Sequence, residues 1–145
     1  MSSESTPASG RLVYMVGLPY SGKTTVCREI YRPKGFAVIC PDQFRLAIHG
    51  QRFIAQAESF VWAAVYAAVD ALRGWGQDVV IDATNVSQKR RDPWASRGGV
   101  AHILWTSKEQ CLARANAMND MYIIPVIERM AMEWDLVPED RHATP

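Results

Sequence analysis

The stretch Gly17-Leu18-Pro19-Tyr20-Ser21-Gly22-Lys23-Thr24 decides the fold of this 145-residue chain. It fits the pattern G-x-x-x-x-G-K-[ST], in which two glycines let the backbone curl so that successive N–H groups point inward, at phosphate oxygens. In such a loop Lys23 reaches the β- and γ-phosphates, and the Thr24 hydroxyl binds Mg²⁺. We therefore expect residues 17–24, with Thr25 directly after them, to hold a nucleoside triphosphate, and we predict ATP and Mg²⁺ as cofactors.

The residues around the loop supply the context that this motif requires. Leu12–Val16 is a β-rich apolar run directly before the loop, and Thr25–Tyr31 is the first predicted helix after it. Strand, loop and helix in this order favour a phosphate-binding loop over a fortuitous glycine turn. Tyr20 stands where related loops often carry glycine, so we expect an aromatic ring at the outer edge of the loop.

The composition indicates one globular domain. An apolar fraction of 48% and a charged fraction of 21% are ordinary, and a net charge of +1 neither favours nor excludes a nucleic-acid partner. The three cysteines are far apart and form no C-x-x-C pair, which argues against disulfides and zinc and indicates a reducing cytoplasm. The longest apolar run, Phe60–Val69, is too short to span a membrane. We expect a disordered tail over residues 1–10, a folded domain over 11–135 and a C-terminal tail over 136–145.

Predicted strands alternate with predicted helices along the folded part. Apolar residues recur at helical spacing over residues 52–73, where Phe60, Trp62 and Tyr66 favour core packing over a base-stacking platform. Further helices are expected at 25–31, 43–48, 89–91 (interrupted by Pro93), 107–118 and 125–134, and strands at 12–16, 36–40, 78–82 and 100–105. The alternation predicts an α/β fold, in which a parallel sheet has helices on both faces and binds ligands at the carboxyl ends of its strands.

Two aspartates are expected at those carboxyl ends. Asp82 ends an apolar strand, as in a Walker B element, and Mg²⁺ uses one or two carboxylates together with phosphates. We therefore predict Thr24 and Asp82 as metal ligands, supported by Asn85; the alternative is a solvated aspartate that caps a turn. Asp42 follows the second strand and can accept the proton of an attacking hydroxyl, a role typically worth 10²–10⁴-fold in rate. Arg45, three residues on, can hold the acceptor in a bidentate fork, although the spacing alone fits an N-cap aspartate and a solvated arginine equally well.

Three pieces of the chain together resemble the polynucleotide-kinase-type P-loop kinases: Gly17–Thr24, Pro41-Asp42-Gln43-Phe44-Arg45 and Val80-Ile81-Asp82-Ala83-Thr84-Asn85. This group includes phage 5′-hydroxyl polynucleotide kinases and phage kinases that phosphorylate 5-hydroxymethyluracil within DNA. The resemblance runs from about residue 11 to 133. It implies a P-loop NTPase fold with three α/β/α layers and a parallel sheet of four or five strands. It also implies Asp42 as the general base, Arg45 as the acceptor-positioning residue, Lys23 on the phosphates, and the cytoplasm of a host cell if a phage encodes the chain.

The match weakens in the lid. The group usually carries R-N-x-x-R on its lid helix, and Arg114 matches the first arginine, which we expect to be catalytic. Met118 or Asn119 stands where the second would fall, and an arginine finger can be worth 10³–10⁵-fold in phosphoryl transfer. Either Arg114 suffices, or one of Arg90, Arg91 and Arg97 reaches in, or turnover is slow.

One local group of basic residues includes an aromatic ring: Lys89, Arg90, Arg91 and Arg97 lie beside Trp94. Such a group suits a phosphodiester backbone with a base stacked on the ring. A solvated helix face is an equally good interpretation.

The leading hypothesis is an ATP-dependent kinase whose acceptor hydroxyl belongs to a nucleic acid, with DNA as the expected partner. The hydroxyl is either a 5′ end or a hydroxymethyl group on a modified base. A chain that stops soon after the lid leaves no room for a phosphatase or ligase, which slightly favours the base-modifying reaction. One alternative is a kinase for a free nucleoside, nucleotide or small metabolite. Another is a regulatory nucleotide-binding module with weak catalysis, as the missing lid arginine suggests.

Overall fold

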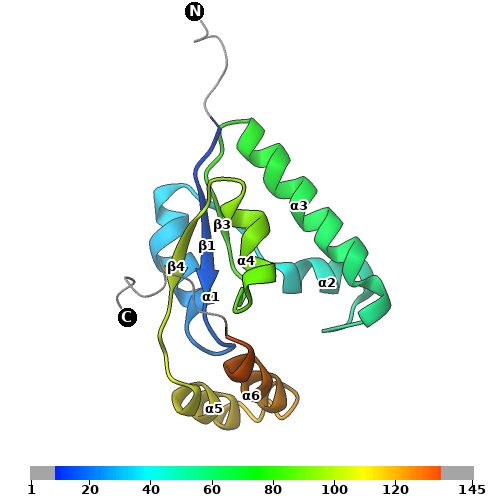
Figure 1. Ribbon diagram of the computed structural model, residues 1–145, viewed down its shortest axis with the longest axis vertical. Coiled ribbons are helices and arrows are strands. Elements are labelled where there is room, and N and C mark those ends of the chain that lie inside the picture. Colours follow the sequence, from blue (N-terminus) through cyan, green and yellow to red (C-terminus); the bar gives the residue numbers. More distant parts are fainter. Residues whose placement is uncertain (1–8, 135–145) are drawn as a thin grey trace, which may run out of the picture.

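The fold is built on a parallel sheet of four strands in the order β2-β3-β1-β4 (Figure 1). The computed structural model describes residues 9–134. The strands are β1 (Leu12–Val16), β2 (Ala37–Ile39), β3 (Val79–Ile81) and β4 (Val100–Ile103). The predicted α/β fold with a parallel sheet is confirmed, and the described residues contain four strands. Because all strands run in one direction, their carboxyl ends meet at one edge, here called the carboxyl edge, opposite the amino edge.

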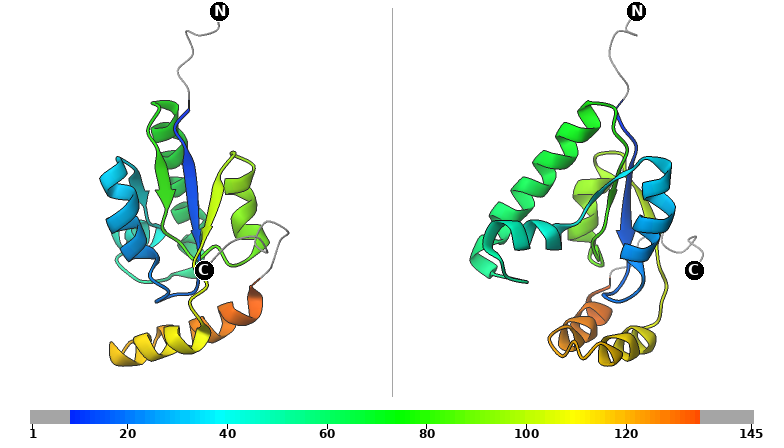
Figure 2. Two further views of the ribbon diagram at one scale, coloured as in Figure 1. Left: turned by 90° about the vertical axis from the view of Figure 1, so that its left-hand side faces the viewer. Right: turned by 180° about the vertical axis from the view of Figure 1, so that it is seen from behind.

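Helices cover both faces of the sheet and its carboxyl edge (Figures 1 and 2). Helices α3 and α4 lie over one face, α1 lies on the other, and α5 and α6 sit beyond the tips of the strands. A π-helical turn over Cys27–Tyr31 and a 3-10 turn over Arg32–Lys34 continue α1. The helices are α1 (Lys23–Val26), α2 (Pro41–His49), α3 (Glu58–Gly74), α4 (Gln88–Ala95), α5 (Lys108–Ala117) and α6 (Ile123–Glu133).

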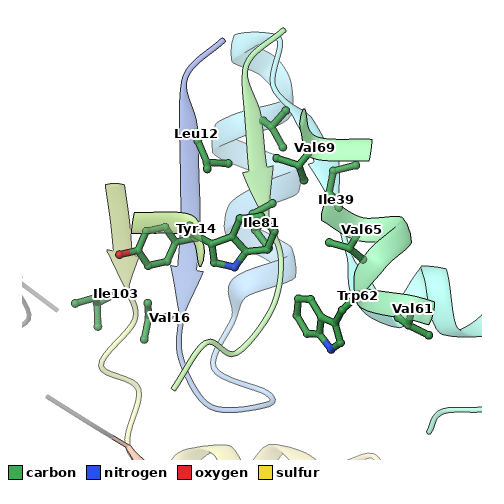
Figure 3. Close-up of a cluster of buried hydrophobic side chains, with 12 residues drawn as sticks. Leu12, Tyr14, Val16, Ile39, Val61, Trp62, Val65, Val69, Ile81 and Ile103 are labelled. Carbon is green, nitrogen blue, oxygen red and sulfur yellow. The ribbon is translucent and has the colours of Figure 1, made fainter. Parts of the chain in front are cut away.

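The core follows from the alternation of side chains along β1. Leu12, Tyr14 and Val16 point to the face covered by α3 and α4, where they join one buried cluster (Figure 3). Met15 points to the opposite face and packs in a second cluster with Cys27 after α1. The central strands are thus buried on both faces, which explains why they read as continuous apolar runs. The first cluster also includes Ile39, Val61, Trp62, Val65, Val69, Val79, Ile81, Trp94 and Ile103.

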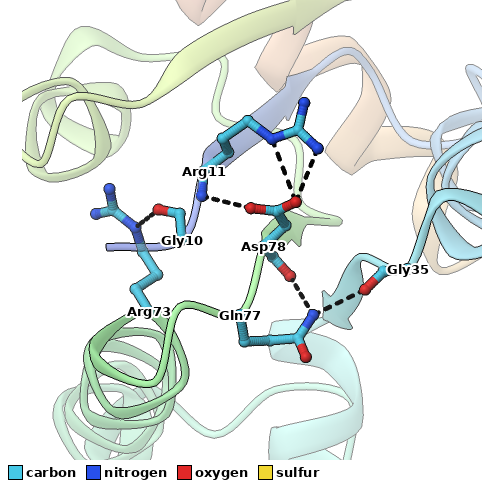
Figure 4. Close-up of polar contacts among 6 residues, drawn as sticks. All are labelled: Gly10, Arg11, Gly35, Arg73, Gln77 and Asp78. Carbon is cyan, nitrogen blue, oxygen red and sulfur yellow. Dashed lines mark hydrogen bonds and ion pairs between the residues drawn. The ribbon is translucent and has the colours of Figure 1, made fainter. Parts of the chain in front are cut away.

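Polar contacts fasten the amino edge (Figure 4). The Arg11 backbone N–H donates to Asp78 Oδ1 over 2.7 Å, and its guanidinium donates to Asp78 Oδ2 through Nε at 3.2 Å and Nη2 at 2.8 Å. Gly10 donates its N–H to the Arg73 carbonyl and accepts from Arg73 Nε. A Cβ on Gly10 would lie 1.8 Å from the Gln77 carbonyl oxygen, so only glycine fits this approach. Gly10 therefore packs against the folded part of the chain. Of the two predicted tails, residues 1–8 and 136–145 lie outside the described residues.

Helix α3 begins later than the sequence predicts. Apolar spacing placed a helix over 52–73, but Ile54 is extended, a single 3-10 turn spans Ala55–Ala57, and α3 starts at Glu58. The expectation of core packing is correct for Trp62, which is 8% exposed, and wrong for Phe60, which is 68% exposed. Helical spacing alone did not distinguish the two faces of this helix at its first turn.

Helix α4 runs through Pro93, contrary to the predicted interruption. The Ser87 side chain accepts from the Arg90 N–H and caps the helix. Trp94, directly after the proline, is completely buried. Burial of this large ring offsets the hydrogen bond that Pro93 cannot donate. Ser107 likewise caps α5, since its side chain accepts from the Gln110 N–H at the start of that helix.

Two further observations concern the described residues as a whole. Their cysteines, Cys27, Cys40 and Cys111, are all free thiols. Over residues 9–134, no helix combines the length and apolar character that crossing a bilayer requires.

Candidate active site

The loop between β1 and α1 has the backbone that the motif predicts. A Cβ on Gly17 would lie 2.6 Å from Ser21 Oγ and would displace this hydroxyl, and Gly22 has φ of 105°, a conformation that favours glycine. The Gly17 N–H donates to the carbonyl of Thr84, which ties the loop to the segment after β3. Tyr20 has φ of 68°, a left-handed conformation that is costly for a bulky side chain.

Lys23 is folded back over the loop. It is 8% exposed, and its Nζ donates to the Leu18 carbonyl over 2.7 Å and to Ser21 Oγ over 3.4 Å. Burial lowers the pKa of Lys23 from 10.5 to about 8, although the charges of Asp82, Cys111 and Asp42 act to raise it. A buried ammonium of this kind is suited to phosphate oxygens, which would supply the negative charge that favours its protonated form.

Thr24 and Asp82, which the sequence predicts as metal ligands, lie in direct contact. Thr24 Oγ1 donates to Asp82 Oδ2 over 2.8 Å, and Asp82 is 7% exposed at the end of β3. A hydroxyl and a carboxylate are hard oxygen donors of the kind that Mg²⁺ prefers. Within residues 9–134, no cluster of three or more His, Cys, Asp and Glu side chains could hold a metal. The pair therefore fits an ion that takes its remaining ligands from phosphates and water.

Asn85 supports the loop after β3 and not the metal pair. It is 2% exposed, has φ of 47°, and its Nδ2 donates to the Met15 carbonyl over 2.8 Å. Its Oδ1 accepts from Trp94 Nε1 over 3.3 Å. Asn85 thus joins β1, α4 and the Asp82 loop, and fixes the backbone at which Asp82 emerges.

Asp42 and Arg45 lie on α2 and belong to a larger ion-pair cluster. Arg45 Nη1 donates to Asp42 Oδ1 over 2.6 Å, while its Nε and Nη2 donate to the two carboxylate oxygens of Glu58, each over 2.9 Å. The bond to Glu58 raises the pKa of Arg45, and the same bond lowers the pKa of Glu58. The Arg45 side chain is 15% exposed, whereas that of Asp42 is 77% exposed. Asp42 is therefore accessible to a substrate, and the guanidinium of Arg45 fixes the orientation of its carboxylate.

Glu58 is the residue that the sequence analysis missed. Its position at the start of α3 was inside a longer predicted helix, where an acidic residue looks like a solvated one. No local signal identifies Glu58, because the burial of Arg45 that requires a carboxylate partner arises only when α2 packs against α3.

Helices α5 and α6 form a lid that packs on the loop. Leu18 lies in a buried cluster with Cys111, Ala115 and Ile127 of the lid. Arg114 Nη1 donates to the Tyr20 carbonyl over 3.0 Å, so this predicted catalytic arginine does lie at the loop. The places expected for a second arginine lie outside the helix, since α5 ends at Ala117 and Asn119 has φ of 55°.

Comparison with known proteins agrees with this architecture. Residues 12–122 match the AAA domain model AAA_33. The chain belongs to this AAA domain family. No curated protein matches the sequence. The fold is that of P-loop kinases.

Several solved structures are also similar to this AAA_33 domain. A chain in the Pnkp1/Rnl/Hen1 complex is similar at 28% identity and a TM-score of 0.67, covering 75% of this chain and 40% of that chain. Kti12 from Chaetomium thermophilum with ADP-AlF3 has 19% identity, a TM-score of 0.67, and coverage of 92% and 86%. A gluconokinase from Sinorhizobium meliloti 1021 has 16% identity, a TM-score of 0.63, and coverage of 90% and 78%. The last two show the fold alone, and the chain spans less than half the length of the chains that it matches in the Pnkp1/Rnl/Hen1 complex.

The predicted basic group does not form an open nucleic-acid surface in this AAA_33 domain. Trp94 is fully buried and cannot stack on a base, and Arg91, 3% exposed, donates to the backbone carbonyls of residues 85 and 86. Arg97 pairs with Asp70, and Arg90 lies 4.2 Å above the Trp62 ring. These contacts also show that Arg90, Arg91 and Arg97 do not replace the second lid arginine in this structure. Packing of α4 against the sheet and α3 overrides the pattern of basic residues.

Proposed function

We propose that this AAA_33 domain is an ATP-dependent kinase that transfers the γ-phosphoryl group to a hydroxyl group of a nucleic acid. The observation that carries the proposal is the Asp42 carboxylate, 77% exposed, fixed by Arg45 and placed at the start of α2, directly after the carboxyl end of β2. A loop for the donor and a carboxylate for the acceptor therefore meet at one edge of the sheet. A domain that only bound nucleotide would need no such carboxylate.

The chemistry follows from these positions. The acceptor oxygen attacks the γ-phosphorus, its proton passes to the Asp42 carboxylate, and the bond to the oxygen that bridges the β- and γ-phosphorus breaks, releasing ADP. Lys23 and Arg114 stabilise the negative charge on the transferred group. Mg²⁺ bound at Thr24 and Asp82 would neutralise charge on the β- and γ-phosphates. Glu58 holds Arg45, and through it Asp42, in the orientation that the proton transfer needs.

A nucleic-acid acceptor is supported by the resemblance of the three motifs and by the likeness to a chain of the Pnkp1/Rnl/Hen1 RNA repair complex. The acceptor hydroxyl is a 5′ end or the hydroxymethyl group of a modified base such as 5-hydroxymethyluracil in DNA. In the second case the base must leave the stack or be met in a single strand, since a carboxylate on a protein rim cannot enter a duplex.

The test is Asp42→Asn with γ-labelled ATP and Mg²⁺. The acceptors are 5′-hydroxyl oligonucleotides, DNA containing hydroxymethyluracil, and free nucleosides. We expect label in a nucleic acid with the wild type, a loss of about 10²–10⁴-fold in the variant, and unchanged ATP binding. Asp92→Asn, at an exposed position on α4, is the matched control and retains full activity.

Other results would redirect the proposal. Label in nucleosides alone would identify a small-molecule kinase with the same site. ATP binding without transfer to any acceptor would identify a nucleotide-binding module. Full activity of Asp42→Asn would remove Asp42 from the role of general base.

A further inference from the structure

The turn between α5 and α6 joins the phosphate loop to the segment before α3. Asp120 Oδ2 accepts from the Tyr20 hydroxyl over 2.9 Å. The same carboxylate accepts from Arg52, through Nη1 at 2.9 Å and Nη2 at 3.1 Å. The Arg52 guanidinium lies 4.5 Å from the centre of the Tyr122 ring. These four residues, Tyr20, Arg52, Asp120 and Tyr122, are called the clasp below.

The clasp lies between the phosphate loop and the segment after α2, the helix that carries the proposed general base. Tyr20 belongs to the phosphate loop, and its carbonyl also accepts from Arg114. Arg52 follows α2, the helix that carries Asp42, by three residues. The carboxylate of Asp120 therefore connects the phosphate loop, where the donor nucleotide would bind, with the segment that follows α2.

Arg45 and Arg52 differ in how much of each guanidinium is open to a substrate. Arg45 is 15% exposed and directs three nitrogens at the carboxylates of Asp42 and Glu58. The Arg52 side chain is 52% exposed, and two of its nitrogens are bonded to Asp120. Within the described residues, Arg52 Nε donates no hydrogen bond, so one edge of this guanidinium faces away from Asp120.

We propose that Arg52 binds a phosphate of the acceptor strand, close to the nucleotide that carries the reacting hydroxyl; the proposal rests on the proposed function. The open guanidinium edge matches phosphate oxygens, which it can bind in a charge-assisted, bidentate manner while Asp120 holds the opposite edge. Tyr122 supports the plane of the guanidinium. The exposed rings of Tyr122, at 50%, and Phe53, at 52%, offer faces for unpaired bases. The fitting partner is therefore a single-stranded or locally unpaired nucleic acid.

The role of Asp120 separates this proposal from a purely structural clasp. If the clasp is purely structural, loss of either Arg52 or Asp120 breaks the same ion pair. Arg52→Ala and Asp120→Asn would then weaken oligonucleotide binding equally. If Arg52 binds a phosphate, binding requires its guanidinium. Asp120→Asn instead removes a negative charge close to the incoming phosphate and retains the shape of the side chain. Arg52→Ala then weakens binding, whereas Asp120→Asn does not.

The experiment measures binding of a fluorescent 5′-hydroxyl oligodeoxynucleotide by anisotropy over a range of salt. We expect Arg52→Ala to weaken binding about tenfold and to flatten the slope of log K against log salt by about 0.7. Arg52→Lys recovers part of the affinity, and Asp120→Asn binds as tightly as the wild type or more tightly. Arg28→Ala is the matched control, since Arg28 is 62% exposed and also pairs with a carboxylate; it leaves affinity unchanged.

The outcomes keep this proposal apart from the proposed function. Equal losses in Arg52→Ala and Asp120→Asn, an unchanged salt slope in Arg52→Ala, or no binding by the wild type would each overturn the role of Arg52. Binding that follows the expected pattern without label transfer from ATP would support Arg52 and overturn the kinase proposal. Melting temperatures of all variants verify that the fold is intact.

Discussion

The two edges of the sheet are built on different principles. At the amino edge, Arg11 and Asp78 satisfy each other through three hydrogen bonds, and Gly10 and Arg73 do so through two. At the carboxyl edge, Tyr20 has a left-handed backbone and Lys23 is a buried cation whose pKa has fallen to about 8. Both edges are made from the same strands. The amino edge stabilises the fold, whereas the carboxyl edge retains strain and unbalanced charge that a substrate would relieve.

The largest expected effect is on catalysis at the carboxyl edge. Lys23→Met should reduce phosphoryl transfer roughly 10²–10³-fold, as loss of one preorganised charge donor does in other enzymes. It should leave the free energy of unfolding at pH 7 unchanged or higher, because the ammonium is buried at a cost. Label transfer and urea denaturation measure the two quantities. A large loss of stability at pH 7 would show that Lys23 holds the fold together, and the contrast between the edges would disappear.

The second effect is a pH dependence of stability. Between about pH 8 and 10.5 the unfolded chain holds a proton on Lys23 that the folded chain has lost, so this residue makes stability rise with pH, by about 3 kcal/mol in total. Cys27 acts in the opposite direction above its ordinary pKa of 9.0, because burial raises its pKa to about 12. Unfolding of the wild type and Lys23→Met should therefore be compared at each pH, which removes the contribution of Cys27 except for the part that Lys23 itself causes. A constant difference from pH 7 to 10 would contradict the lowered pKa of Lys23.

A smaller effect, on the free energy of unfolding, is expected for substitutions of Asn85, which joins the carboxyl edge to the core. Asn85→Ala leaves the Met15 carbonyl and the Trp94 indole N–H buried without their partner, at a cost of about 1–3 kcal/mol in the free energy of unfolding. Asn85→Gly is the informative companion, because it permits φ of 47° but makes neither hydrogen bond. Wild-type stability in Asn85→Gly would mean that only the backbone conformation matters.

The smallest effect is expected at the amino edge. Asp78→Ala removes the acceptor for the Arg11 N–H and guanidinium, and should lower the melting temperature by about 2–4 °C. Transfer activity should remain at the wild-type level, because this edge lies at the opposite end of the strands from the loop. A loss of activity out of proportion to the loss of stability would show that the two edges are coupled.

The sequence predicts well where local chemistry is decisive. The loop from Gly17 to Thr24 and the strand that ends at Asp82 were identified because their patterns follow from backbone geometry and metal chemistry. The caps at Ser87 and Ser107 also lie within a few residues of the helices that they start. In each case the evidence is contained in a short stretch of chain.

Contacts between distant segments were beyond such reasoning. Glu58 reaches Arg45 and Arg52 reaches Asp120 only after α2, α3 and the lid have packed. Trp94 and Arg91 read as an exposed basic group because nothing local shows that α4 turns them into the protein. Residue type predicted which chemistry is present, and packing decided which charges are accessible.

The stacked pair of Trp105 and Trp134 has an optical consequence. Their ring centres lie 5.6 Å apart at an interplanar angle of 17°, and they join the segment after β4 to the end of α6. Two indoles at this separation couple electronically, which produces a paired near-ultraviolet circular dichroism signal and shifts their fluorescence. Movement of α6 away from β4 separates the rings and removes the signal. The protein thus carries an intrinsic, label-free spectroscopic signal of the position of its lid, which a stopped-flow instrument can follow after mixing with ATP.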